Sequence, residues 1–290
     1  MSGGNLQDIR RRVRSVKNIQ QITRAMKFVA ASKLRRAQDR IFAARPYANR
    51  MLAVLNSLAT RADPEHHPLL VEREQEKVML VVITSDRGLC GAFSANIIKA
   101  ATRYIEEKSA KDALSLALVG RKGVDWFGQR SWPIRHKYVD IMTRVDFKYA
   151  QEMAQSLIEY YASADLDAVY LVYNEFKSVV QQDVTIEPLL PIKHLEIEDQ
   201  DQARLDYIYE QPPPVLFDHL LSRHVETQVF RAMLESEAAE HGARMTAMDS
   251  ATRNAGEMID QLTLYMNRMR QASITTEIIE VVSGADALGQ

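Results

Sequence analysis

A glycine-bearing turn follows the most apolar segment of the chain. Residues 78–83 read Val-Met-Leu-Val-Val-Ile, which is typical of a buried strand, and residues 84–93 lead from it into a helical pattern. Such a turn can bind phosphate through backbone N–H groups and a helix N-terminus. Gly88 and Gly91, however, are spaced G-x-x-G, and neither G-x-G-x-x-G nor G-x-x-x-x-G-K-[ST] occurs. A tight turn with close helix–strand packing explains these glycines better than a nucleotide site.

The other reactive side chains form no recognisable catalytic or metal site. Cys90 is the only cysteine, and no histidine stands near it in the sequence to act as a base, so we interpret it as structural. His66 and His67 are adjacent and therefore point to different sides of a helix or strand. His219 and His224 miss the i, i+4 spacing of two ligands on one helix face. We expect no catalytic residue, no cofactor and no metal.

The middle of the chain predicts an α/β domain. Strands are expected at 78–83, 114–119, near 138–141, 168–176 and 179–189, and helices at 92–108, 122–128 and 147–161. Strands that alternate with helices predict a mostly parallel sheet. The last two strands follow each other closely, so we expect them to pair antiparallel.

The N-terminal segment predicts one long helix. It has no glycine between Asn5 and Arg87, and a 3.5-residue repeat runs from Ile9 to Leu58. About 50 residues at 1.5 Å each make a rod roughly 75 Å long. Pro46 is expected to kink or divide this helix. Three positions in the middle of the repeat are polar: Gln20, Thr23 and Lys27. These residues either fix the register of the helix against its partner helix, or no partner helix is present at this place.

The same repeat runs through the C-terminal segment from Leu234 to Thr276. Because both ends of the chain leave one central domain, the simplest burial for both apolar seams is against each other; separate partner helices are the alternative. The predicted fold class is therefore α/β: a long antiparallel coiled coil of N- and C-terminal helices plus a Rossmann-like α/β domain with a mostly parallel sheet. We expect the N-terminal coiled-coil helix at 1–60, a linker at 61–76, the α/β domain at 77–206 and the C-terminal coiled-coil helix at 207–290.

The charge is unevenly distributed along the chain. The 37 Lys and Arg against 38 Asp and Glu give a net charge of −1, but residues 1–50 hold 13 basic and two acidic side chains. The aromatic residues that stack on bases are nearly absent from this basic helix, so an acidic protein partner explains the charge better than nucleic acid does. A third interpretation, an enzyme with helical extensions, would require a nucleotide site near Gly88 and Gly91.

Nothing in the sequence predicts a membrane span or a leader. The longest wholly apolar run, residues 78–83, is far shorter than the ~20 residues that a membrane helix needs. A charged amphipathic stretch begins soon after Met1, which argues against a signal peptide. These features predict a cytosolic protein in a reducing compartment.

Three stretches resemble the gamma-subunit family of F-type, proton-translocating ATP synthases. They are residues 22–38 (ITRAMKFVAASKLRRAQ), residues 84–91 (TSDRGLCG) and residues 267–286 (NRMRQASITTEIIEVVSGAD). The last stretch is the most specific of the three, and the resemblance extends over the whole chain.

The resemblance implies a mechanical role. In that family the terminal helices form a shaft inside a ring of alpha and beta subunits, while the α/β domain sits with the epsilon subunit on a membrane-embedded ring of c subunits. Proton flow turns the rotor, and the shaft drives the beta catalytic sites in sequence; the gamma chain carries no catalytic residue, contacts no nucleic acid and does not span the membrane. Chloroplast relatives carry a regulatory cysteine pair, whereas this chain has only Cys90, so thiol regulation is not expected.

The resemblance also implies positions for contacts and a location. Met26 and Lys27 should face the beta subunits, and Arg270, Gln271 and Thr275 should meet the catch region of a beta subunit. The last turns should enter an apolar bearing at the top of the ring, with these residues: Ile278, Ile279, Val281, Val282 and Leu288. The start at Met1 without a transit peptide favours a peripheral protein on the cytoplasmic face of a bacterial cell membrane.

Overall fold

The computed structural model describes residues 3–59, 67–107, 114–179, 181–192 and 212–288. The elements follow one another as α1 (Gly3–Ala59), β1 (Val78–Ile83), α2 (Phe93–Glu107), β2 (Leu114–Val119), α3 (Arg121–Phe127), β3 (Ile134–Tyr138), α4 (Phe147–Ala162), β4 (Ala168–Phe176), β5 (Gln182–Leu190) and α5 (Pro213–Leu288). Two compact units form: Met1–Val29 with Met245–Gln290, here called the distal unit, and Ala30–Arg244, here called the domain unit.

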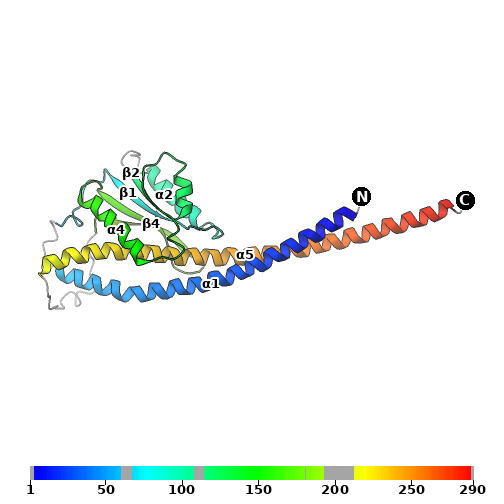
Figure 1. Ribbon diagram of the computed structural model, residues 1–290, viewed down its shortest axis with the longest axis horizontal. Helices are drawn as coiled ribbons and strands as arrows, with labels where there is room; N and C mark the ends of the chain where they lie inside the picture. The colour runs from blue at the N-terminus through cyan, green and yellow to red at the C-terminus, as the bar shows by residue number, and fades with distance from the viewer. Residues whose placement is uncertain (1–2, 60–66, 108–113, 180, 193–211, 289–290) are drawn as a thin grey trace. The chain divides into compact units, whose positions relative to one another are not determined.

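The domain unit is built on one five-stranded sheet of order β3-β2-β1-β4-β5. β1 pairs in parallel with both β2 and β4, β2 pairs in parallel with β3, and β5 is antiparallel to β4. The predicted mostly parallel sheet with one antiparallel pair is therefore confirmed. In Figure 1, β1, β2 and β4 lie between α2 and α4.

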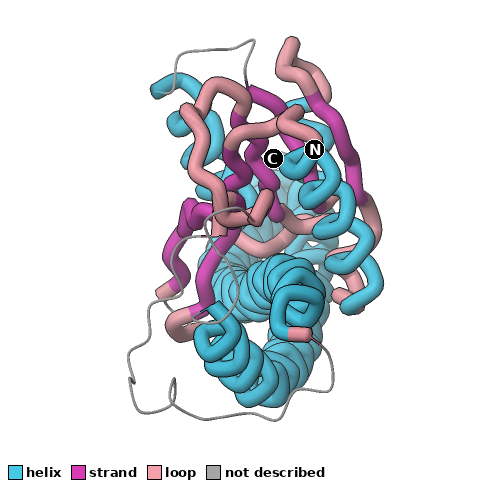
Figure 2. The backbone as a smooth tube through the Cα atoms, turned by 90° about the vertical axis from the view of Figure 1, so that its left-hand side faces the viewer, coloured by secondary structure: helices cyan, strands magenta, loops and turns pink. Residues whose placement is uncertain are grey.

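Both faces of the sheet are covered, which explains the unbroken apolar run of β1. Met79, Val81 and Ile83 point into one core with α4 and the α1 and α5 segments of the domain unit, whereas Leu80 and Val82 point into a second core with α2 and α3. Figure 2 shows helices on both sides of the strands. All six β1 residues are buried as a result.

Three expected elements differ in detail. The strand expected near 138–141 lies earlier, at Ile134–Tyr138, because Asp140 adopts a φ of 62° that ends the extended run. The last strand begins at Gln182 and not at 179, since a turn closes where the Ser178 N–H donates to the Gln181 carbonyl at 2.9 Å. Pro46 does not divide α1, which continues as one helix from Gly3 to Ala59.

Candidate interaction surfaces

The polar positions of the distal seam have partners on α5. The Thr252 hydroxyl donates to Thr23 Oγ1 at 2.8 Å, and Lys27 Nζ lies 2.5 Å from Asp249 Oδ1. A Cβ on Gly256 would lie 3.1 Å from Gln20 Nε2. The α5 partner advances from 249 to 256 as the α1 residue falls from 27 to 20, so the two helices are antiparallel. Of the two explanations for the polar seam, these pairs favour the fixing of register.

The same register leaves the end of α5 without an α1 partner. Extended from the Lys27–Asp249 pair, it sets Gly3, where α1 begins, opposite residue 273. The described side chains from 274 onward are indeed all exposed. Besides Ile274, which is 48% exposed, four of them are large and apolar, with exposed fractions from 54% to 71%: Ile278, Ile279, Val281 and Val282. We call these four residues the apolar tip; the side chain of Leu288 lies outside the described part.

The predicted beta-contact residues fall at two places along the distal unit. Met26 and Lys27 are half-buried on α1, and Lys27 is paired with Asp249. Arg270, Gln271 and Thr275 are exposed on α5, where the Thr275 hydroxyl donates to the Gln271 carbonyl at 2.9 Å. Arg270 follows Asp249 by 21 residues, a separation of about 30 Å along a helix. These residues therefore form two separate patches, and no contact joins them.

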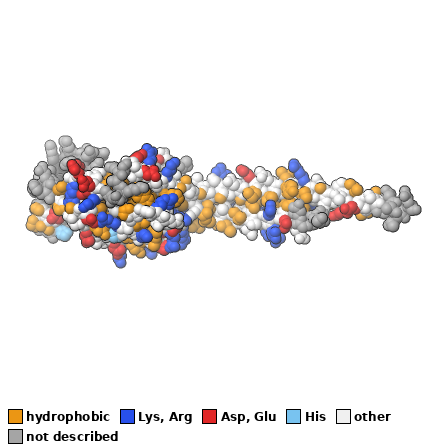
Figure 3. All heavy atoms as spheres, turned by 90° about the horizontal axis from the view of Figure 1, so that it is seen from above, with side chains coloured by type: hydrophobic (Ala, Val, Ile, Leu, Met, Phe, Trp, Pro, Cys, Tyr) orange, Lys and Arg blue, Asp and Glu red, His pale blue; other side chains and the backbone are white. Residues whose placement is uncertain are grey.

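Large apolar side chains are also exposed along the paired helices of the distal unit. Sequence reasoning assigned only Met26 and the tip residues among the large apolar side chains to a contact surface. Eight further side chains are between 48% and 62% exposed, the last of them just beyond the end of the pairing: Ile19, Ile22, Phe28, Val29, Met258, Leu264, Tyr265 and Ile274. Figure 3 shows hydrophobic side chains at the surface of these helices. These residues lie outside the 3.5-residue repeat that the two helices bury, so their apolar side chains were the signal in the sequence for a further contact surface. So much exposed apolar surface marks an interaction site.

The N-terminal arginines form an exposed basic face on α1. Arg10, Arg12, Arg14 and Lys17 are exposed, and Arg11 makes an exposed ion pair with Asp8 at 3.0 Å. An exposed pair of this kind contributes less than about 1 kcal/mol to stability. The face is therefore available to a partner that carries negative charge.

The turn after β1 contains a carboxylate that accepts hydrogen bonds from nearby backbone N–H groups. The Asp86 carboxylate accepts hydrogen bonds from the N–H groups of Arg121 at 3.0 Å, Asp140 at 2.9 Å and Met142 at 2.9 Å. Asp86 is only 7% exposed. The backbone donors that could bind a phosphate at the start of α3 are thus occupied by a side chain of the turn itself.

Close backbone contacts complete this turn. Gly120 has a φ of 87°, and a Cβ there would lie 2.2 Å from the carbonyl oxygen of Thr84. The Thr84 hydroxyl in turn donates to the Val119 carbonyl at 2.9 Å. Cys90 is buried, and burial raises the pKa of its thiol, which disfavours the reactive thiolate. These contacts agree with the interpretation of the turn as a packing element.

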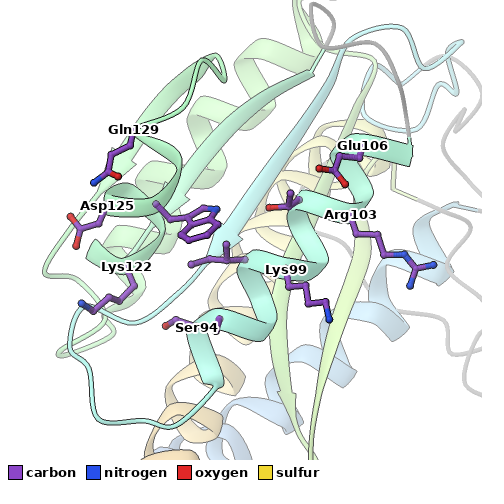
Figure 4. Close-up of a pocket in the computed structure, with 11 residues that line it drawn as sticks. Ser94, Lys99, Arg103, Glu106, Lys122, Asp125 and Gln129 are labelled. Atoms are coloured by element: carbon purple, nitrogen blue, oxygen red, sulfur yellow. The ribbon is translucent and has the colours of Figure 1, made fainter.

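A groove of about 850 Å³ lies between α2 and α3 on the far side of the sheet from α4. Figure 4 shows Ser94, Lys99, Arg103 and Glu106 on α2 and Lys122 on α3 along its sides. Arg103 is paired with Glu107 at 2.6 Å, which reduces the charge that it offers to a ligand. The groove contains no cluster of groups with an evident catalytic geometry.

No helix among the described residues has an apolar stretch long enough to cross a bilayer. No group of three or more His, Cys, Asp or Glu among them is placed to hold a metal ion. His224 and His241 are buried, and desolvation lowers the pKa of each to about 4.

Comparisons with known proteins agree with the coiled coil and its domain. A family model described as ATP synthase matches residues 5–288. The chain is 52% identical over 287 residues to the ATP synthase gamma chain of Solibacter usitatus and 49% identical over 285 residues to that of Geobacter sp. strain M21; each alignment covers 98% of this chain and 99% of the relative.

Solved structures give the same result for the fold. A chain of the Tetrahymena thermophila mitochondrial ATP synthase central stalk and c-ring is similar with a TM-score of 0.61 and 26% identity, over 79% of this chain and 99% of that one. A chain of the Euglena gracilis mitochondrial enzyme shares the fold with a TM-score of 0.68 over 99% of this chain and 95% of that one. The chain belongs to the gamma-chain family of ATP synthases.

Proposed function

We propose that this chain is the central rotor shaft of an F-type ATP synthase. It couples proton flow through the membrane sector to ATP synthesis or hydrolysis at the beta-subunit catalytic sites. Its partners are the alpha and beta subunits around the distal unit, and the epsilon subunit and the ring of c subunits at the domain unit. The observation that carries the proposal is the apolar tip, where α5 extends beyond α1 with four large apolar side chains exposed.

The exposed side chains of the apolar tip require a partner that buries them. Each large apolar side chain that moves from water into an apolar environment contributes about 1.5–3 kcal/mol. A single helix without an α1 partner cannot provide that environment, so a surrounding protein must. An apolar collar of alpha and beta subunits around Ile278, Ile279, Val281, Val282 and Leu288 provides it and still allows rotation, because apolar contacts are not directional.

The other parts of the proposal rest on the same family. The chain acts as a non-catalytic subunit, and the beta subunits carry the chemistry. It is a peripheral protein at the cytoplasmic face of a bacterial cell membrane. The division at 1–60, 61–76, 77–206 and 207–290 stays a prediction, and its boundaries at 60–61 and 206–207 lie outside the described residues.

Contact with the beta subunits is assigned to Met26, Lys27, Arg270, Gln271 and Thr275. A beta site that switches from about 1:99 to 99:1 between two states needs ~5.5 kcal/mol of differential interaction. One exposed ion pair contributes at most about 1 kcal/mol. Most of the coupling must therefore come from the steric fit of the whole shaft, and polar contacts adjust it.

A double substitution tests this assignment. Arg270→Ala with Gln271→Ala should leave assembly intact and lower steady-state ATP turnover severalfold, because the remaining shaft still pushes on the ring. The assay is ATP hydrolysis by the reconstituted ring, normalised to its content of this chain. Unchanged turnover would remove both residues from the coupling contact, and failure to assemble would make them structural.

Co-purification tests the proposal as a whole. The chain expressed with alpha and beta subunits should elute with them as one complex at high salt, because burial of the apolar tip does not weaken with ionic strength. Elution of the chain by itself, with an alpha–beta ring that hydrolyses ATP in its absence, would overturn the proposed shaft.

A further inference from the structure

Helix α5 carries four buried glutamates where it passes along the sheet of the domain unit. Glu226, Glu235, Glu237 and Glu240 are between 5% and 9% exposed. Burial raises the pKa of Glu237 and Glu240, and nearby Arg40 and Arg244 oppose that rise. Buried carboxylates are destabilising unless they are paired, and apolar residues often stabilise a core as well or better. Four of them on one helix therefore suggest a role beyond stability.

One side of α5 is bonded to the β4–β5 hairpin. The Phe176 N–H, at the end of β4, donates to Glu235 at 3.0 Å. One turn earlier, Arg231 Nη2 donates to both carboxylate oxygens of Glu187 in β5 at 2.7 Å. Two turns after Glu235, a Cβ on Gly242 would lie 3.4 Å from the Phe176 ring, so the hairpin touches the helix backbone closely.

The opposite side of α5 is bonded to α1 and to the turn after β1. Arg244 Nη2 lies 2.5 Å from Glu240 Oε1 and donates to the Gly88 carbonyl at 3.2 Å. Arg40 of α1 lies 3.0 Å from Glu237 Oε2 and also donates to the carbonyl oxygen of Val145, just before α4. The Glu240–Arg244 pair is almost dry, with side chains 6% and 13% exposed.

Helix geometry shows that these hydrogen bonds are made on two opposite sides of α5. Nine residues separate Glu235 from Arg244, and at about 100° per residue their side chains point in opposite directions, roughly 14 Å apart along the axis. Glu237 lies within about 20° of Arg244 by the same geometry. A rotation of α5 about its own axis would therefore stretch bonds on both sides at once.

We propose that Glu235, Glu237, Glu240 and Arg244 form a polar clamp that fixes the rotational position of α5 in the α/β domain, so that torque passes between domain and shaft without slip. The clamp rests on the proposed function of the chain as a rotor shaft. Its members are positioning residues, since none of them touches a nucleotide or a reacting atom.

Hydrogen bonds suit this task better than apolar contacts. Apolar contacts are non-directional and resist rotation only through the fit of the packed side chains. Hydrogen bonds weaken steeply when the angle at the hydrogen falls below ~120°, so a small rotation is resisted at once. Bonds to charged groups are also about twice as strong as neutral ones.

The test removes charge pairs without leaving a buried charge alone. Glu240→Gln with Arg244→Met, and separately Arg40→Met with Glu237→Gln, loosen the clamp at two places. The matched control is Arg103→Met with Glu107→Gln, because that pair is also an Arg–Glu pair four residues apart but is 78% and 59% exposed on α2. Arg244→Lys should retain coupling, since an ammonium can still donate to Glu240 and to the Gly88 carbonyl.

The measurement uses the complete complex in sealed vesicles. ATP hydrolysis and the steady ion gradient that hydrolysis sustains are both recorded per assembled complex. The clamp variants should hydrolyse ATP at the wild-type rate or faster and sustain a gradient severalfold smaller, because a loosened α5 yields as the opposing load grows. The control and Arg244→Lys should match the wild type.

The outcomes separate the clamp from mere stability and from the proposed function. A wild-type gradient in both clamp variants would overturn the clamp. Loss of hydrolysis and gradient in equal proportion would also overturn it, since that is the effect of weakened folding. If one variant does not assemble, the other pair decides. Absence of ion transport by the wild-type complex would overturn the proposed rotor function, and the clamp with it.

Discussion

Replacement of Asp86 should destabilise the domain unit in a graded way. Its carboxylate accepts three backbone N–H groups, two at Oδ1 and one at Oδ2. In Asp86→Ala all three donors lose their partner, at about 1–3 kcal/mol for each donor that stays buried. The bond from the Met142 N–H is buried, whereas those from the Arg121 and Asp140 N–H groups are only partly buried, so we expect a total loss of about 4 kcal/mol.

Asp86→Asn separates charge from geometry. Its amide oxygen can keep the two bonds at the Oδ1 position, but its NH₂ group would face the Met142 N–H, where two donors cannot bond. We therefore expect a loss of about 2 kcal/mol, between those of the wild type and Asp86→Ala. The control is Asp140→Asn, which removes an exposed ion pair with Arg121 in the same loop and should cost less than about 1 kcal/mol.

The assay is urea unfolding of the isolated chain, followed by tryptophan fluorescence. Both tryptophans, Trp126 and Trp132, lie between β2 and β3, so the signal reports on the domain unit and not on the distal helices. A loss below about 1 kcal/mol in Asp86→Ala, or a larger loss in Asp86→Asn than in Asp86→Ala, would refute this account of the turn.

Three further predictions concern packing, the distal seam and pH. Gly120→Ala should lower the free energy of unfolding by more than about 2 kcal/mol in the same assay, because its φ is 87° and the new Cβ would meet the Thr84 carbonyl. Leu262→Asp should cost about 1–2 kcal/mol, measured by thermal melting of helix circular dichroism, since Leu262 is a half-buried position of the 3.5-residue repeat. The pKa of His224 and that of His241 are lowered to about 4 in the folded state, so the unfolded state binds more protons below pH ~6.5. Stability should therefore fall by up to about 3 kcal/mol per histidine as pH drops from 6.5 to 4, and His224→Gln with His241→Gln should flatten that slope.

The periodic parts of the fold could be predicted from the sequence because burial follows a repeat. Each position of the 3.5-residue repeat from Ile9 to Leu58 is buried or half-buried. β1 and β2 were predicted with their observed ends, since both are buried on both faces and therefore wholly or almost wholly apolar. The edge strand β3 was misplaced because three of its five residues, Arg135, His136 and Lys137, are polar in succession, whereas Val139 and Ile141 are apolar but lie outside the strand.

The polar interior could not be predicted in this way. Glu235, Glu237 and Glu240 are charged residues of a type that is rarely buried, and only their partners from β4, α1 and α5 itself explain their burial. Asp86 likewise bonds residues more than thirty positions away. The contact positions Arg270, Gln271 and Thr275 came from the resemblance alone, because an exposed polar residue has no periodic pattern that marks it as a contact.

Rotation of a marker attached to the α/β domain tests the rotor function most directly. A Cys90→Ser, Lys99→Cys chain has one exposed thiol on α2, far in sequence from the predicted beta-contact residues. With the alpha–beta ring fixed to a surface and a bead on that thiol, ATP should drive the bead around in one direction. A bead that stays still while the same complexes hydrolyse ATP would contradict the account.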